Sequence, residues 1–155
     1  MDDLKINDIV FSPNFGIGKV LGFEEIDGSK DTFVVIESRE KNFRSLIPIK
    51  EVNNFRKQSS LEMIKNLLEK LGSSIKIEEF ESKKHRILYF KEKALNQNLE
   101  NVSDTILELR AIQDRGKIEN QILESLITSL SIEIGVVLDV DRKKAGEILN
   151  DSFKA

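Results

Sequence analysis

The residues best suited to chemistry or to binding lie in one short run, residues 83–93, which reads KKHRILYFKEK. The run carries five Lys or Arg against one Glu, an excess of four positive charges in a chain whose net charge is −3. Cations interleaved with apolar side chains can form a phosphate-contacting helix face, whose binding is salt-sensitive because counterions are released. A handful of such contacts gives weak, sequence-independent affinity, on the order of 10⁻⁴–10⁻⁶ M. An ordinary solvated helix face is the alternative interpretation.

Side chains that could catalyse a reaction are few. His85 is the only histidine and the chain has no cysteine, so we expect an exposed or phosphate-contacting imidazole and not a metal ligand. Glu78, Glu79 and Glu81 are interpreted as the first turn of a helix, where the helix dipole favours negative charge. The segment Gly16–Gly18 lacks the third glycine and the Lys-Ser/Thr pair of nucleotide-binding loops. The sequence therefore favours a binding protein over an enzyme, with no metal, cofactor or small-molecule substrate.

The first 58 residues show the pattern of short strands. Runs of β-branched and aromatic residues alternate with Pro and Gly turn signals at a spacing of about ten residues, which is typical of a small, strongly bent sheet or partial barrel. Pro13–Gly18 is predicted to be a turn, and Asp27–Lys30 a tight type I′ hairpin turn. The predicted strands are Asn7–Ser12, Lys19–Ile26, Thr32–Ile36 and Phe43–Ile49.

From Ser59 onwards the apolar spacing changes to a period near 3.6, which predicts helices. Ser59 and Glu62 have the spacing of a capping box, and Gly72 would end the first helix. The face of this helix that we expect to be buried comprises Leu61, Ile64, Leu67, Leu68 and Leu71. Four further helices are predicted over about residues 78–95, from Asn101 or Ser103 to Gly116, over about 118–138, and after an N-cap at Asp141.

These patterns predict an α+β fold with its boundary near Gln58. Residues 1–58 form a small β-rich domain, and residues 59–155 form a compact bundle of about five helices. The opening segment Met1–Lys5 lacks the apolar stretch of a secretory signal, and no apolar run approaches the ~20 residues that cross a bilayer. The absence of cysteine suits a reducing compartment, so we expect a cytoplasmic protein without membrane contact.

Several segments, in their order along the chain, resemble the bacterial CarD/CdnL proteins and the polymerase-interacting domain of transcription-repair coupling factors. Val10–Pro13 and Gly16–Gly18 lie where that family has a strand ending in Val-Tyr-Pro and then a Gly-x-Gly turn, with Ser12 inserted before the proline. Leu46–Ile49 resembles the family's M-x-V-P-V segment. Residues 102–117, 123–140 and 141–153 follow the family's helical order.

The resemblance implies a Tudor-like β domain that docks on the β subunit of RNA polymerase and a helical domain that touches promoter DNA, stabilising the open complex. An exposed strand edge is a natural docking site, because it can recruit a partner strand through backbone hydrogen bonds. The implied polymerase-binding residues are Phe43, Arg44, Leu46, Ile47 and Pro48. The implied DNA-binding residues are Lys83, Lys84, His85 and Arg86, to which the basic run adds Lys91. A protein of this kind regulates transcription and is associated with the nucleoid through the polymerase.

One departure from the family concerns tryptophan. Relatives commonly place a Trp beside the basic segment, where it wedges into the minor groove, but this chain has no Trp and the position falls on or near Lys83. An apolar wedge unstacks a base step, whereas a lysine contacts phosphates or groove acceptors. We therefore expect weaker and more salt-sensitive promoter binding than in a Trp-bearing relative.

Two binding hypotheses remain open at this stage. In the first, the helical domain contacts promoter DNA through the basic run. In the second, the chain is a polymerase adaptor whose helical domain recruits another protein, which the negative net charge and the missing Trp favour. Charge reversal in the basic run separates them, because only the first predicts lost DNA contact.

Overall fold

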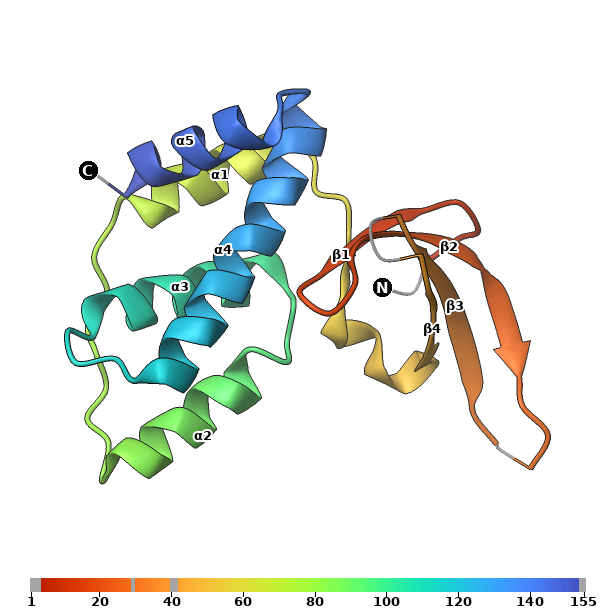
Figure 1. The fold of residues 1–155 in the computed structure, drawn as a ribbon, viewed down its shortest axis with the longest axis horizontal. Helices are drawn as coiled ribbons and strands as arrows, with labels where there is room; N and C mark the ends of the chain where they lie inside the picture. Colours follow the sequence, from red (N-terminus) through yellow and green to blue (C-terminus); the bar gives the residue numbers. More distant parts are fainter. Residues whose placement is uncertain (1–3, 29, 40–41, 154–155) are drawn as a thin grey trace.

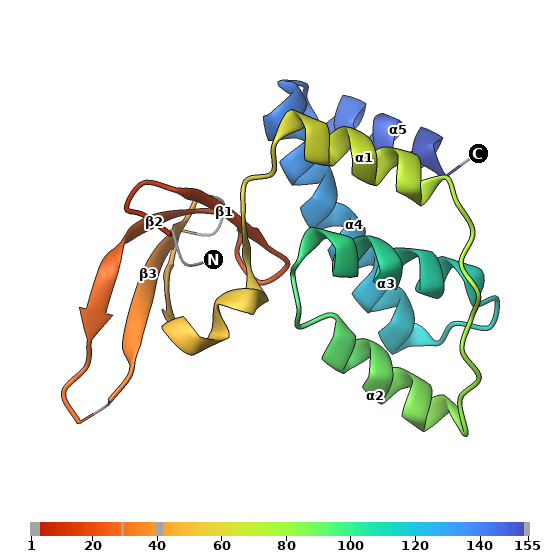
Figure 2. The same cartoon turned by 180° about the vertical axis from the view of Figure 1, so that it is seen from behind.

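The computed structural model describes residues 4–28, 30–39 and 42–153, apart from the side chains of residues 52 and 53. Within these residues an antiparallel sheet is followed by five α-helices, which confirms the predicted α+β fold (Figure 1). The sheet lies to one side of the helices, and the segment between β5 and α1 joins the two parts (Figure 2).

The sheet has five strands in the described residues, in the order β4-β3-β2-β1-β5, and every neighbouring pair is antiparallel. It is open, so β4 and β5 are its two edges. A 3₁₀ segment, η1 (Ile49–Asn54), leads from β4 to β5, a strand that was not predicted because two residues carry no alternating pattern. The strands are β1 (Ile9–Ser12), β2 (Gly16–Glu25), β3 (Thr32–Ser38), β4 (Arg44–Pro48) and β5 (Arg56–Lys57).

Apolar side chains on one face of the sheet form its core. The buried residues of this core are Val10, Phe15, Val20, Val34, Ile36 and Phe55. Gly16 begins β2 with a φ of 71°, so the predicted turn is shorter than expected and ends before the glycines. A Cβ on Gly18 would lie 2.6 Å from Cγ2 of Ile36. The Gly-x-Gly segment therefore serves close packing within the sheet.

The connection between β2 and β3 differs from the predicted tight turn. The last paired residues are Glu25 and Thr32, so the loop is longer than two residues. Gly28 has a φ of 86°, whereas Asp27 is not in the left-handed region that a type I′ turn requires at both central positions. The hairpin itself is confirmed, and Ser29 lies outside the described residues.

The five helices have ends defined by side-chain caps and glycines. Asp141 caps α5 by accepting a hydrogen bond from the Lys144 N–H (2.8 Å), as predicted. The predicted capping box at Ser59 is wrong, because the neighbouring Ser60 caps α1 instead. The helices are α1 (Leu61–Leu71), α2 (Lys83–Lys93), α3 (Leu99–Ala111), α4 (Lys117–Leu138) and α5 (Arg142–Ser152).

The helix of the basic run, α2, is shorter than predicted. Ser82 caps it by accepting from the His85 N–H, so the acidic residues 78–81 precede the helix and do not form its first turn. Phe90 is buried in the bundle, whereas Leu88 is 52% exposed. In α1, Leu61 is 47% exposed and does not belong to the buried face.

The longest helix, α4, is central to the bundle. It is 22 residues long and apolar enough, by length and composition alone, to cross a membrane, so the expectation that no apolar stretch approaches this length was wrong. Its buried side chains, among them Leu126, Leu130 and Ile134, belong to one core with those of the other four helices. It also carries the buried carboxylates of Glu119 and Glu133, both of which are ion-paired. These contacts are those of the core helix of a bundle.

Candidate functional site

The first turn of α2 is fastened to the bundle by Arg86. Its side chain is only 12% exposed and forms two hydrogen bonds with the buried Glu119, one of them 2.8 Å from Nη2 to Oε1. Nη1 donates to Oδ1 of Asp114 at 3.0 Å. These hydrogen bonds raise the pKa of Arg86 and hold the pKa values of Glu119 and Asp114 below their ordinary values. Arg86 thus links α2 to the α3–α4 corner.

The last turn of α2 is fastened by a second charged group. Lys93 Nζ lies 2.8 Å from Oε2 of Glu108 on α3, and the Tyr89 hydroxyl donates to the same carboxylate at 3.1 Å. Burial raises the pKa of Tyr89. Burial would lower the pKa of Lys93, but its hydrogen bonds to Glu108 and Tyr89 outweigh that effect, and the pKa is raised. Both ends of α2 are therefore held mainly by charge.

Internal pairing neutralises most of the basic run. Lys83 lies 3.5 Å from Asp114, and Arg86 and Lys93 have the partners given above. When the three acidic partners are set against the run's excess of four positive charges, one positive charge is left. His85 is exposed and lies 3.3 Å from Glu81.

The outward face of α2 carries the predicted DNA-binding residues Lys84 and Lys91, both exposed. Lys84, Leu88, Lys91 and Leu95 follow one another at spacings of three or four residues, so they share this face. Among the described residues, neither Lys84 nor Lys91 has an acidic partner within ion-pair distance. Of the predicted DNA-binding residues, Arg86 alone is engaged deep within the bundle.

The predicted polymerase-binding residues lie along β4, at one edge of the sheet. Leu46 is 46% exposed, Phe43 precedes the strand and is exposed, and Ile47 and Pro48 are half-buried. Arg44 is exposed and lies 3.8 Å from Glu37 on β3. The structure therefore brings these five residues together along β4 and the position directly before it.

The backbone of β4 offers unpaired groups to a partner. The Ser38 N–H donates to the Phe43 carbonyl at 2.9 Å, and opposite residues of an antiparallel pair alternate between hydrogen-bonded and non-bonded. Ser45 and Ile47 therefore bond to β3, while the N–H and C=O groups of Arg44 and Leu46 point away from the sheet. No other strand in the described part of the chain covers this edge.

A buried ion pair joins the sheet to the helices. Arg56 on β5 lies 2.6 Å, from Nη2 to Oε1, from Glu133 on α4, and both side chains are buried. Oε2 of Glu133 accepts from the Ser59 N–H at 2.9 Å, and Oε1 of Gln97 accepts from Nη1 of Arg56 at 3.0 Å. We call these four residues the interdomain latch. It joins β5 to α4 and to the segment that follows α2.

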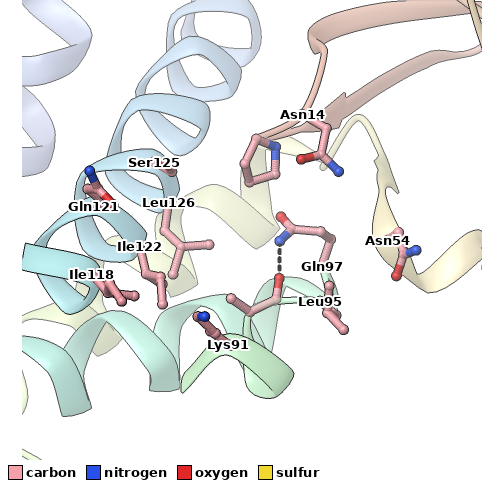
Figure 3. A pocket seen from close by; sticks show the side chains of 12 residues that line it. Asn14, Asn54, Lys91, Leu95, Gln97, Ile118, Gln121, Ile122, Ser125 and Leu126 are labelled. Carbon is pink, nitrogen blue, oxygen red and sulfur yellow. Dashed lines mark hydrogen bonds between the residues drawn. The ribbon is translucent and has the colours of Figure 1, made fainter. Parts of the chain in front are cut away.

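The β1–β2 turn, α2 and α4 enclose a hollow of about 270 Å³ (Figure 3). Asn14 and Asn54 lie on its sheet side, and Lys91, Leu95 and Ile118 on its helix side. The latch residue Gln97 forms part of the wall. No cluster of three His, Asp or Glu side chains that could hold a metal occurs among the residues that the structure describes.

The latch was missed by sequence reasoning. Arg56 and Glu133 are 77 positions apart, and β5 is too short to be recognised. One signal was present, since Glu133 interrupts the apolar stretch of α4, and an acidic residue in a buried helix generally requires a cation or several donors. Arg56, which follows the buried Phe55, was the basic residue to consider.

Residues 4–59 match the family model of the CarD-like/TRCF RID domain. The match covers the whole sheet and ends before α1. Residues 4–59 are therefore similar to a CarD-like domain of the kind that interacts with RNA polymerase, and this similarity points to a transcription-related role. No curated protein matches the chain.

Replacement of Glu133 tests the latch. Glu133→Gln leaves the buried guanidinium of Arg56 without its charge partner, so the free energy of unfolding should fall by about 3–5 kcal/mol. Urea denaturation measures the change. The matched control is Asp31→Asn, which removes a charge from the exposed Lys50–Asp31 pair (3.2 Å) and should cost less than about 1 kcal/mol. Equal effects of the two substitutions would contradict the latch.

Acidification tests how α2 is fastened. Because the folded-state pKa of Glu119 is lowered, its contribution is complete above the ordinary value of 4.5 and is lost as the pH falls through the folded-state pKa. Unfolding midpoints in urea, measured from pH 6 down to about pH 3, should drop below pH 4.5 in the wild type and drop less in Glu119→Gln. Glu124→Gln, on the exposed side of the same helix, should keep the wild-type slope; a flattened slope there would refute the assignment.

Proposed function

We propose that this protein is a transcription regulator that binds the β subunit of RNA polymerase through the free edge of β4 and contacts promoter DNA through α2. The observation that carries the proposal is the uncovered β4 edge, which lies in a domain of the polymerase-interacting family. The role proposed for the helical domain is stabilisation of the open complex.

Strand addition explains why the edge suits a protein partner. The groups of Arg44 and Leu46 that point away from the sheet can pair with an added strand, which gives affinity through the main chain. The exposed side chain of Leu46 can then select an apolar neighbour. Pro48 has no N–H, so the added strand would pair no further along β4.

Contact with DNA would depend on few charges. We carry Lys83 and Lys84 into the proposal, because both are exposed at the start of α2; Lys83 also lies 3.5 Å from the exposed Asp114. We leave Arg86 out, because its guanidinium is engaged by Glu119 and Asp114. Two neutralised phosphates give a weak interaction with a salt slope of about −2, so tethering by the polymerase is needed.

A second candidate is a polymerase adaptor whose helical domain recruits another protein. The internal neutralisation of the basic run favours it, because most of the cations already have acidic partners. In either case we propose a cytoplasmic binding protein and not an enzyme.

Substitution on β4 tests polymerase docking. Leu46→Glu places a charge on the docking edge and should weaken binding to purified RNA polymerase at least about tenfold, as expected for a hot-spot residue. Leu61→Glu is the matched control, since Leu61 is 47% exposed but lies on α1. Binding of the fluorescently labelled full-length protein measures both. If Leu46→Glu binds like the control, docking does not use this edge.

Charge reversal at the start of α2 tests DNA contact. The double variant Lys83→Glu, Lys84→Glu should shorten the half-life of the open complex and reduce the salt slope by about two. The control is Lys143→Glu, Lys144→Glu, an adjacent lysine pair in the first turn of α5. Unchanged half-life and slope in the α2 variant, with polymerase binding intact, would favour the adaptor.

A further inference from the structure

The hollow between the two parts of the chain continues alongside β4. A second hollow, of about 380 Å³, is lined by Leu46 and Pro48 of β4 and by Asn14 and Asn54. Asn14 and Asn54 also line the first hollow, on the side that faces the sheet (Figure 3). The two hollows therefore share these asparagines in their walls. We call the two hollows together the groove, which is lined by β4 at one side and by α2 and α4 at the other.

We infer that the polymerase segment that pairs with β4 continues as an extended peptide along this groove and ends against α2 and α4. The inference rests on the proposed docking at β4 and deepens it, because it makes the helical part of the chain a polymerase-binding surface too. The first argument for this occupant is that the groove adjoins the β4 edge at which docking is proposed.

The lining of the groove has the chemistry of a peptide site. Asn54 and the exposed Gln121 and Ser125 offer amide and hydroxyl groups, which suit the donors and acceptors of an extended backbone. Leu95, which is 61% exposed, and Ile118 line the helix side of the groove, with Lys91 between them, and can receive apolar side chains (Figure 3). A peptide that fits carries an apolar residue next to an Asp or Glu.

The charges of the groove disfavour nucleic acid as the occupant. Lys91 is the one charged residue that lines the first hollow, and Glu51 lines the second. Affinity for DNA needs several cations along the backbone path, and a carboxylate on that path repels phosphates. A single cation at one end suffices for one carboxylate of a peptide.

The latch gives the groove its shape. Gln97 lies in its wall and accepts a hydrogen bond from Arg56, which is held by Glu133 on α4. The sheet side and the helix side are thereby held at a fixed separation before the partner arrives. A groove formed in advance spares the partner the cost of ordering the two parts.

Substitutions on the helix side of the groove test the inference. Leu95→Glu and Lys91→Glu in the full-length chain should each weaken binding to purified RNA polymerase, without DNA, by about fivefold to tenfold. The controls are Leu88→Glu and Lys143→Glu, at exposed residues of α2 and α5 that do not line the groove. Circular dichroism melting checks that all four variants fold.

The outcomes separate the inference from the proposed function. If Leu46→Glu weakens binding and the groove variants do not, docking at β4 stands and the inference is overturned. If neither weakens it, the proposed function fails. If only the groove variants weaken it, the continuous path from β4 is wrong.

Crosslinking identifies the occupant. A photoreactive amino acid at position 95 should crosslink to a polymerase β-subunit segment adjoining the one captured from position 46. Capture of another subunit or of promoter DNA at position 95 would overturn the inference.

Discussion

The arrangement of this protein depends on one buried ion pair, between Arg56 and Glu133. Burial of two charges brings a desolvation penalty that attraction alone rarely offsets, so pairs of this kind often contribute little net stability. The contribution of this pair is that it joins the sheet to α4. The carboxylate also holds the Ser59 N–H at the start of the connection to α1, so the sheet, the connection and α4 share one polar centre. The pair thus ties the part of the chain that carries β4 to the part that carries α2.

Charged contacts also hold α2 against the rest of the bundle. This helix buries one large side chain fully, Phe90, and otherwise meets the bundle through Arg86 near one end and Tyr89 and Lys93 near the other. A helix held by ion pairs responds to salt and acid more than one held by apolar contacts. Its charged residues therefore either hold the helix against the bundle or face solvent. Those that hold the helix are not available to an external partner. Lys84 and Lys91 remain at the surface.

Much of the fold could be predicted from the sequence because its elements have strong local periods. The strands before Gln58 and the helices after it follow patterns of two and 3.6 residues, and the N-cap at Asp141 is a local signal. Prediction failed where a distant residue decides the local structure. The backbone of Ser59 is engaged by Glu133, and the adjacent Ser60 caps α1. The family resemblance pointed to β4 as the candidate docking strand, but the sequence of the basic run does not reveal the acidic residues at 108, 114 and 119 that neutralise most of its charge.

The brevity of β5 has a consequence for modularity. The polymerase-interacting domain ends within a few residues of α1, and its last strand contributes Arg56 to a partner site built on α4. A chimera that joins this sheet to a foreign helical domain would therefore leave the guanidinium of Arg56 without a charge partner at the junction. The graft would need an acceptor equivalent to Glu133, and an amide equivalent to Gln97, at matching places in the new domain. The unit that can be exchanged between proteins is therefore the sheet together with the helical residues that hold Arg56.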